Sequence, residues 1–196
     1  MHDESGDPTR HASGLPVQMD GSCNGLQHYA ALGRDVEGAF QVNVSPSDRP
    51  QDGYSAVCDI VASAITADAA TPLESAADDP ELAKRIRHAR LVSGLIDRKV
   101  VKQTVMTSVY GVTFVGARNQ IYARLFEKLE AEGRVGGVDE EDQVLEKELF
   151  GAAAYVARQT MDAMAQLFTS ARAIMDWLAT CARLVAREGH AMSWVT

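Results

Sequence analysis

A single aspartate, Asp20, stands where a short extended run gives way to glycine and then to a helical pattern. Before it, Leu15, Val17 and Met19 alternate with other residues, which is the period of a half-buried strand. A carboxylate at a strand end, next to a glycine, can bind a hard cation together with a neighbouring backbone carbonyl. Asp20 is therefore a candidate metal ligand, although an aspartate in this setting is by itself more often a turn or cap residue.

A second run places two cations and two larger side chains on one face of a helix predicted over about 97–111. Arg98, Lys102, Met106 and Tyr110 recur every four residues and form one stripe, about 18 Å long at a helical rise. Two cations at the positive end of a helix suit a polyphosphate, and a thioether and a phenol further along suit a base and a sugar. The alternatives are a solvated charged face and a core stripe of Met and Tyr.

The two runs resemble motifs A and B of the single-subunit, phage-type RNA polymerases, most closely the mitochondrial members. They read Asp20-Gly21-Ser22-Cys23-Asn24-Gly25-Leu26-Gln27-His28-Tyr29, continuing to Asp35, and Arg98-Lys99-x-x-Lys102-x-x-x-Met106-Thr107-x-x-Tyr110-Gly111. Their order and separation also fit that family, and the resemblance extends from about residue 15 to residue 196.

The resemblance implies template-directed nucleotidyl transfer from ribonucleoside triphosphates, with Mg²⁺ as the cofactor of a two-metal mechanism. Asp20 would be catalytic and would bind magnesium together with the carbonyl of Gly21. Lys102 is also assigned a catalytic role. Gln103 departs from the pattern, because some relatives carry a second basic residue there, and this puts one accessory phosphate contact in doubt.

The same resemblance assigns the stripe to substrate binding. Arg98 and Lys102 would hold the triphosphate of the incoming nucleotide. Met106 and Tyr110 would border the templating base pair, and the Tyr110 hydroxyl would help to sense the ribose 2′-hydroxyl. Gly111 would allow a close approach of the backbone, and its simpler role is to end the helix.

Apolar residues recur with helical spacing through most of the chain. Helices are predicted from about Leu26 to a turn bracketed by Gly33 and Gly38, over 52–67, 81–92, 97–111 and 114–131, and as two or more helices within 143–190, with a linker at 68–80. Ser22 or Asn24 could cap the first helix, and Asp97 the 97–111 helix. Tyr54 resembles a family position near the nucleotide pocket, and the alternative is that it packs on the apolar side of its own helix.

The predicted fold is mainly α with minor β, and the resemblance makes it part of the palm plus the helical fingers of a right-hand nucleotide polymerase. Residues 1–14 are expected to be a disordered segment or the edge of a fragment. Residues 15–48 would form a partial palm with motif A, and residues 49–196 the fingers with the motif B helix. A second strand is expected to begin within 192–196.

The formal net charge of −8 over 196 residues argues against a free-standing nucleic-acid binder. Basic residues nevertheless cluster between Lys84 and Arg90 and again in the 97–111 helix. Three widely spaced cysteines, Cys23, Cys58 and Cys181, favour a reducing compartment without structural zinc. No apolar run reaches membrane-spanning length.

The family's motif C, a His-Asp-Ser hairpin with the second metal-binding aspartate, has no match in this sequence. The chain is therefore expected to be an internal polymerase fragment that is inactive in isolation, and the alternative is a catalytically inactive fragment that binds nucleotide or nucleic acid. A related DNA polymerase is disfavoured, because DNA polymerases of this superfamily usually place a bulky acidic residue shortly after the aspartate, where Gly21-Ser22-Cys23 stands here.

The resemblance also implies partners and a compartment. The expected partners are a DNA template, the RNA product, ribonucleoside triphosphates and, in the full-length enzyme, transcription factors, with no membrane. The expected compartment is the mitochondrial matrix, with a plastid or phage origin left open.

Overall fold

The structure is a computed structural model that describes residues 14–16, 21–136 and 140–193. The helices are α1 (Asn24–Gly33), α2 (Val36–Gln41), α3 (Gly53–Ala70), the short 3₁₀ helix η2 (Leu73–Ala76), α4 (Pro80–Val92), α5 (Arg98–Ser108), α6 (Phe114–Ala131), α7 (Glu140–Leu167) and α8 (Thr169–Arg187). The prediction of a mainly α fold is confirmed, and no strand occurs in the part of the chain that the structure describes. The two predicted strands fall largely on residues 17–20 and 194–196, which lie outside the described residues.

Several helices begin where the sequence supplies a polar cap. Asp97 accepts hydrogen bonds from the N–H groups of Lys99 (2.9 Å) and Val100 (3.1 Å), which confirms it as the cap of α5. Thr113 caps α6 by accepting from the N–H of Gly116 at 3.1 Å, and the bounds predicted for this helix are confirmed. These interactions satisfy N–H groups that have no partner within their own helix.

The predicted cap of α1 is wrong, and the turn predicted between Gly33 and Gly38 is present but shorter than expected. Cys23, not Ser22 or Asn24, is the cap of α1, with a left-handed φ of 62° and no capping hydrogen bond from its side chain. Gly38 does not close a turn, because it lies inside α2, where its N–H donates to the Asp35 side chain at 2.9 Å. The chain reverses instead at Arg34, whose φ is 53°.

Two further boundaries differ from the prediction. The expected linker at 68–80 is shorter, because α3 continues to Ala70 and η2 occupies Leu73–Ala76. The motif B helix ends at Ser108, and Gly111 follows in the next turn with a φ of +79°. Glycine reaches this left-handed conformation without the strain that other residues meet.

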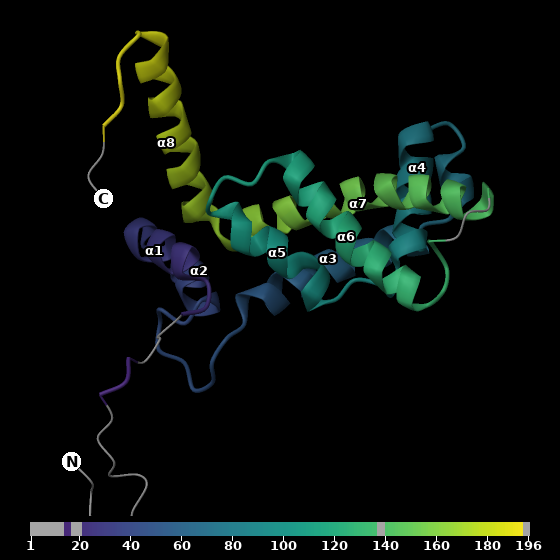
Figure 1. Cartoon of the computed structure of the whole chain (residues 1–196), viewed down its shortest axis with the longest axis horizontal. Helices are drawn as coiled ribbons and strands as arrows, with labels where there is room; N and C mark the ends of the chain where they lie inside the picture. Colours follow the sequence, from purple (N-terminus) through teal and green to yellow (C-terminus); the bar gives the residue numbers. More distant parts are fainter. Residues whose placement is uncertain (1–13, 17–20, 137–139, 194–196) are drawn as a thin grey trace, which may run out of the picture.

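Helices α3, α5, α6 and α7 form the body of the molecule, and α7 runs along its length (Figure 1). Apolar residues from all four helices make its core, among them Val57, Val61 and Ile65 of α3, Val100 and Val101 of α5, Ile121 and Leu125 of α6, and Leu149 and Val156 of α7. Burying a Val, Leu or Ile side chain stabilises a fold by about 1.5–3 kcal/mol. The core thus fixes α5 between its neighbours through one side of that helix.

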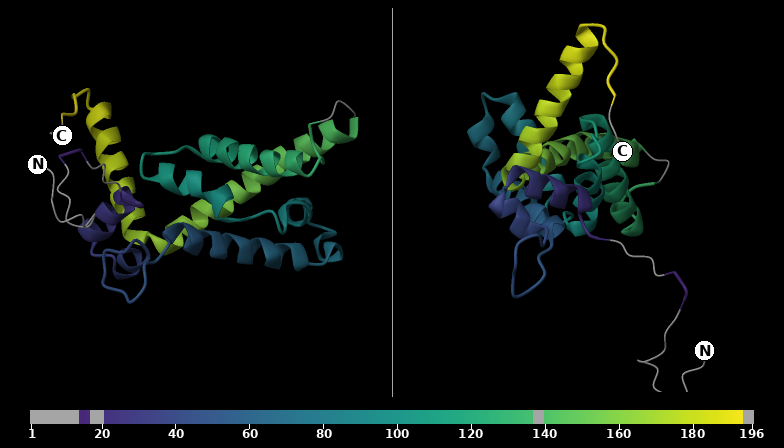
Figure 2. Two further views of the ribbon diagram at one scale, coloured as in Figure 1. Left: turned by 60° about the horizontal axis from the view of Figure 1, so that its bottom comes forward. Right: turned by 90° about the vertical axis from the view of Figure 1, so that its left-hand side faces the viewer.

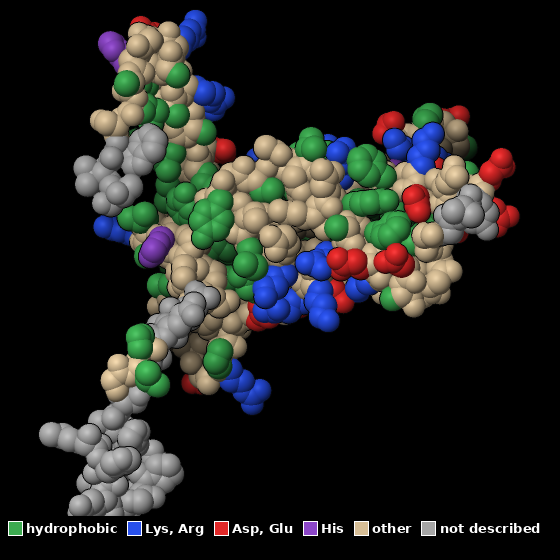
Figure 3. All heavy atoms as spheres, in the orientation of Figure 1, with side chains coloured by type: hydrophobic (Ala, Val, Ile, Leu, Met, Phe, Trp, Pro, Cys, Tyr) green, Lys and Arg blue, Asp and Glu red, His purple; other side chains and the backbone are tan. Residues whose placement is uncertain are grey.

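Helices α1, α2 and α8 lie together at one end of the body, and α8 projects away from it in two further views (Figure 2). Hydrophobic side chains lie along α8 in the space-filling view (Figure 3). Trp177 is 64% exposed and Leu184 is 57% exposed, and Ala171 is the buried residue of this helix. None of the described helices is both long enough and apolar enough to cross a membrane.

The loop between α2 and α3 is closed by a pair of amide contacts. Asn43 donates from its side-chain nitrogen to the carbonyl of Gln51 at 2.8 Å, and its side-chain oxygen accepts from the N–H of Gln51 at 2.6 Å. This loop spans the predicted boundary at residue 48. The division into palm and fingers stays a prediction.

Candidate functional site

The turn before α1 and one face of α5 meet at a small cavity of about 160 Å³. The turn and the start of α1 contribute Gly21, Cys23, Asn24, Gly25 and Leu26, and α3 contributes Tyr54. The end of α5 and the turn after it contribute Val105, Met106, Val109 and Tyr110. The fold therefore brings together four residues that the sequence singled out separately: Gly21, Tyr54, Met106 and Tyr110.

Close packing between α1 and the end of α5 builds one wall of this cavity. A Cβ atom added at Gly25 would lie 2.6 Å from Cγ2 of Val109, which is closer than packed atoms allow. Glycine at position 25 thus lets the two predicted motifs touch. Gly25 belongs to the motif A pattern, but no local feature of the sequence indicates this contact.

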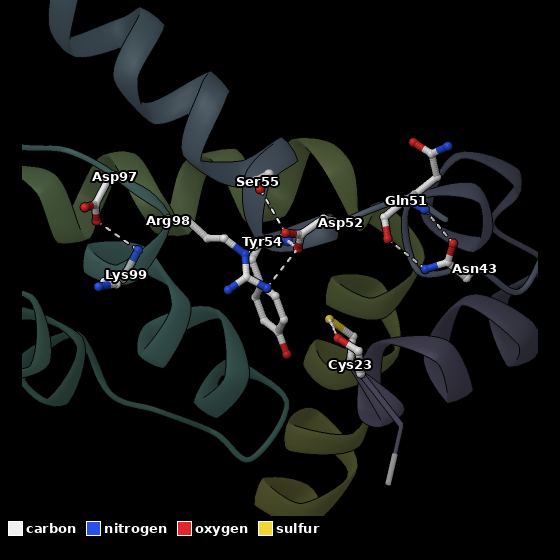
Figure 4. A network of polar contacts seen from close by, with 10 residues as sticks. Cys23, Asn43, Gln51, Asp52, Tyr54, Ser55, Asp97, Arg98 and Lys99 are labelled. Atoms are coloured by element: carbon white, nitrogen blue, oxygen red, sulfur yellow. Dashed lines mark hydrogen bonds and ion pairs between the residues drawn. The ribbon is translucent and has the colours of Figure 1, made fainter. Parts of the chain in front are cut away.

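Arg98 lies beside the cavity and forms an ion pair with Asp52, which the sequence predicts only as the first residue of the 52–67 helix. Its Nε donates to Oδ2 of Asp52 at 2.5 Å, and its Nη2 lies 3.4 Å from Oδ1 (Figure 4). Partial burial raises the pKa of the Asp52 carboxyl, but hydrogen bonds from Arg98 and Ser55 outweigh it and hold the pKa below its ordinary value. The hydrogen bond to Asp52 in turn raises the pKa of Arg98.

Tyr54 lies beneath both cations of the predicted stripe. The Arg98 guanidinium is 5.0 Å from the centre of its ring and the Lys102 ammonium is 5.9 Å from it, which are distances typical of cation–π contact. The side chain is buried, and burial together with the neighbouring Cys23 thiol raises the pKa of Tyr54 to about 12. Tyr54 is therefore a neutral phenol near pH 7, and it both packs in the core and lines the cavity.

The other residues of the stripe are open to solvent. Met106 is 41% exposed and Tyr110 is 82% exposed, so the alternative of a buried core stripe is wrong for these two. Lys102 is also exposed, and it lines a groove of about 620 Å³ between α5 and α6. A Cβ at Gly111 would meet no atom within 4 Å, so no described residue crowds the backbone there.

The candidate magnesium site is only half described. Gly21 is exposed at the cavity, but Asp20 lies outside the described residues. Within the described ranges, no three His, Cys, Asp or Glu side chains group closely enough to hold a metal ion. The described part therefore offers one backbone carbonyl of the predicted ligand set, and that carbonyl is of the hard-oxygen type that suits magnesium.

Comparison with known proteins decides the family. A sequence profile described as DNA-dependent RNA polymerase matches residues 1–195. The chain belongs to this polymerase family. It is 47% identical over 189 residues to DNA-directed RNA polymerase 1, mitochondrial, of Nicotiana sylvestris, an alignment covering 96% of this chain and 17% of that protein.

Other polymerases match over nearly the same span. DNA-directed RNA polymerase 2A of Nicotiana tabacum is 44% identical over 192 residues, which cover 98% of this chain and 52% of that relative. DNA-directed RNA polymerase 2, chloroplastic/mitochondrial, of Arabidopsis thaliana is 44% identical over 189 residues, covering 96% and 17% of the two chains. The chain thus spans about a sixth of the length of two of these relatives and about half of the third.

Proposed function

We propose that this chain is the nucleotide-selecting part of a DNA-directed RNA polymerase, which carries out template-directed nucleotidyl transfer from ribonucleoside triphosphates. The observation that carries the proposal is the cavity where the motif A turn, Tyr54 and the α5 stripe meet beside Arg98 and Lys102. Membership of the polymerase family supports it. Ligand sites in proteins are typically concave and mostly apolar, with a few placed polar groups that fix the orientation of the ligand.

The stripe along α5 suits the successive parts of a nucleoside triphosphate. Arg98 and Lys102 lie at the first two turns of the helix and would donate charge-assisted hydrogen bonds to the phosphates. Met106 and Tyr110 follow one and two turns later and would contact the base and the ribose. The positive left-handed φ of Gly111 turns the chain away after Tyr110 and leaves that ring exposed to an incoming ligand.

Asp20 and the carbonyl of Gly21 would hold Mg²⁺. When bound, magnesium neutralises charge on the transferring phosphate and activates the attacking 3′-hydroxyl. The proposed role of Gly21 is supported by its position at the mouth of the cavity. The proposed role of Asp20 rests on the motif alone.

The proposed partners and compartment follow from the relatives. A polymerase of this family would act on a DNA template and extend an RNA product, with transcription factors joining the full-length enzyme. Relatives with mitochondrial and with chloroplastic/mitochondrial names support a mitochondrial matrix location and keep a plastid location open.

Substitution of Asp20 in a full-length polymerase that carries this segment tests the proposal. Asp20→Asn keeps the shape of the side chain but loses the charge that holds magnesium, so elongation should be abolished while template binding is retained. Asp162→Asn, at an exposed position on α7, is the matched control and should elongate normally. A loss of elongation smaller than about tenfold, or roughly 1.4 kcal/mol of activation free energy, would exclude Asp20 as a metal ligand.

A further inference from the structure

The Asp52 carboxylate gathers donors from two helices. It accepts from the backbone N–H of Tyr54 at 3.1 Å and from the Ser55 hydroxyl at 2.9 Å, both at the start of α3. It also accepts from Nε and Nη2 of Arg98, at the start of α5, which is 46 residues away. One carboxylate therefore both caps α3 and ties the first residue of α5 to it (Figure 4).

This arrangement fixes the Arg98 guanidinium and leaves part of it available. The carboxylate accepts hydrogen bonds from Nε and Nη2 of the guanidinium, while Nη1 forms no hydrogen bond with any described residue. The ring of Tyr54, itself buried, supports the guanidinium at 5.0 Å. A guanidinium held in this way keeps donors for a second anion.

Lys102 provides an internal contrast. It lies one turn further along the same stripe and over the same ring, at 5.9 Å, but forms no ion pair with any residue in the described ranges. Lys102 therefore remains a rotatable point charge, whereas Arg98 has a fixed orientation.

We propose that Asp52 is a positioning residue, which holds Arg98 in the orientation that receives the phosphates of the incoming nucleotide. The inference rests on the proposed function, because it requires Arg98 to be a phosphate contact. Asp52 touches no substrate itself, and it acts through Arg98 alone.

Asp52 has two opposing effects on an anion at this site, and their balance sets the sign of the test. Its negative charge repels phosphate, but the two side chains of the pair are 39% and 43% exposed, so water and salt screen that repulsion strongly. Without Asp52, the long Arg98 side chain would have to be ordered each time an anion binds, and salt does not reduce this entropic cost. Removing the Asp52 charge should therefore weaken anion binding.

The experiment measures binding of inorganic triphosphate to the 196-residue chain by NMR titration. Asp52→Asn should weaken binding by roughly threefold or more, and Arg98→Gln should weaken it further. The double variant should bind as Arg98→Gln does, because Asp52 has nothing left to position. Asp79→Asn is the matched control: Asp79 caps α4 by accepting from two N–H groups, at 3.1 and 3.0 Å, and should show unchanged binding.

Thermal melting separates positioning from capping. Asparagine caps helices about as well as aspartate, whereas alanine does not. Asp52→Asn and Asp52→Ala should therefore weaken triphosphate binding alike, while Asp52→Ala alone lowers the melting temperature substantially. Binding that follows the melting temperature instead would make Asp52 a structural cap and overturn the inference.

The remaining outcomes separate the positioning role of Asp52 from the phosphate contact proposed for Arg98. If Arg98→Gln weakens binding and Asp52→Asn does not, the positioning role is overturned and the proposed phosphate contact stands. If Asp52→Asn weakens binding equally in the Arg98→Gln background, Asp52 does not act through Arg98 and the inference fails. If Arg98→Gln leaves binding unchanged, the proposed phosphate contact itself is wrong, and the role of Asp52 with it.

Discussion

Lys102 and Tyr110 carry different parts of the proposed function and contribute little to the fold. Lys102 is exposed on α5 and Tyr110 is exposed in the turn that follows this helix, while Val101 and Val105 of α5 are buried. Substitutions at the two exposed positions should therefore alter ligand interactions without disturbing the core. That separation makes them suitable for tests at the scale of single residues.

Lys102→Ala should weaken triphosphate binding and leave stability nearly unchanged. An exposed lysine contributes little to stability, and alanine favours the helix. The lost charge-assisted hydrogen bond should reduce affinity by about 1.5–3 kcal/mol if it is fully formed. Titration with inorganic triphosphate and thermal melting of the same samples provide the measurement. Lys147→Ala, at an exposed position of α7, controls for the change in net charge, and a large melting loss with normal binding would make Lys102 structural.

Tyr110→Phe should relax the discrimination between ribonucleotides and deoxyribonucleotides in a full-length polymerase that carries this segment. The ring is retained, and only the hydroxyl that can sense the 2′-position is lost. A site that bonds a hydroxyl disfavours the analogue without it, because a polar group is left unpaired. The ratio of kcat/KM for the two sugars measures the effect, with Tyr122→Phe on α6 as the control. An unchanged ratio would show that sugar selection lies elsewhere.

Helix α5 is anchored at its start by two acidic residues with separate tasks. Asp52 reaches Arg98 from α3, and Asp97 caps α5 and pairs with Lys128 of α6 at 2.7 Å. Partial burial raises the pKa of Asp97, but the hydrogen bonds from Lys128 and from the N–H of Val100 outweigh it and hold the pKa below its ordinary value. Two carboxylates thus tie the start of α5 to α3 and to α6, in addition to the buried residues that fix this helix.

Asp97→Asn should lower stability near pH 7 and lower it less at pH 2. The pKa of Asp97 is lower in the folded chain, so its contribution is present above the ordinary carboxyl pKa of about 3.9 and is lost as the pH falls through the folded value. Asparagine keeps the cap, so only the ion pair is removed, about 0.2–1 kcal/mol for side chains 30% and 46% exposed. Urea unfolding at the two pH values measures the difference.

The outcome at low pH decides the interpretation of that comparison. A stability gap as large at pH 2 as at pH 7 would mean that the variant disturbs packing or the cap and that the ion pair has no role. Asp162→Asn, which removes an exposed carboxylate from α7, should show no gap at either pH.

At the scale of the whole molecule, stability is concentrated in the body and falls toward α8. Helices α3 and α7 each bury several apolar residues, whereas α8 buries Ala171 near its start and leaves Trp177, Leu178 and Leu184 exposed. Local opening is easiest where few apolar contacts must be broken. The C-terminal half of α8 is therefore the least protected of the long helices.

Amide hydrogen exchange should be faster in residues 178–187 than in residues 152–164 of α7. The second segment lies in the core, with Ala153, Val156 and Ala157 fully buried. Exchange measured by mass spectrometry on the intact chain checks the order. Equal protection of the two segments would show that contacts made by the exposed face of α8 stabilise it in solution.

Much of the helical framework follows from local sequence. Helix α6 begins and ends at the predicted residues because Thr113 supplies a cap and apolar residues recur with helical spacing. Asp97 caps α5 for the same reason, and four-residue spacing places Arg98, Lys102 and Met106 on one face of that helix, whereas Tyr110 lies in the turn after it. The predicted strands fall largely on residues 17–20 and 194–196, and Asp20 falls on the first of these ranges, so these predictions remain open.

Only the tertiary structure decided which of these residues meet. The pairing of Asp52 with Arg98, the position of Tyr54 beneath Arg98 and Lys102, and the contact of Gly25 with Val109 each join residues far apart in the chain. The left-handed Cys23 at the start of α1 likewise replaced the expected polar cap. Helical period and capping are properties of neighbouring residues and can be found in the sequence, whereas these contacts depend on how the helices pack, which no local pattern encodes.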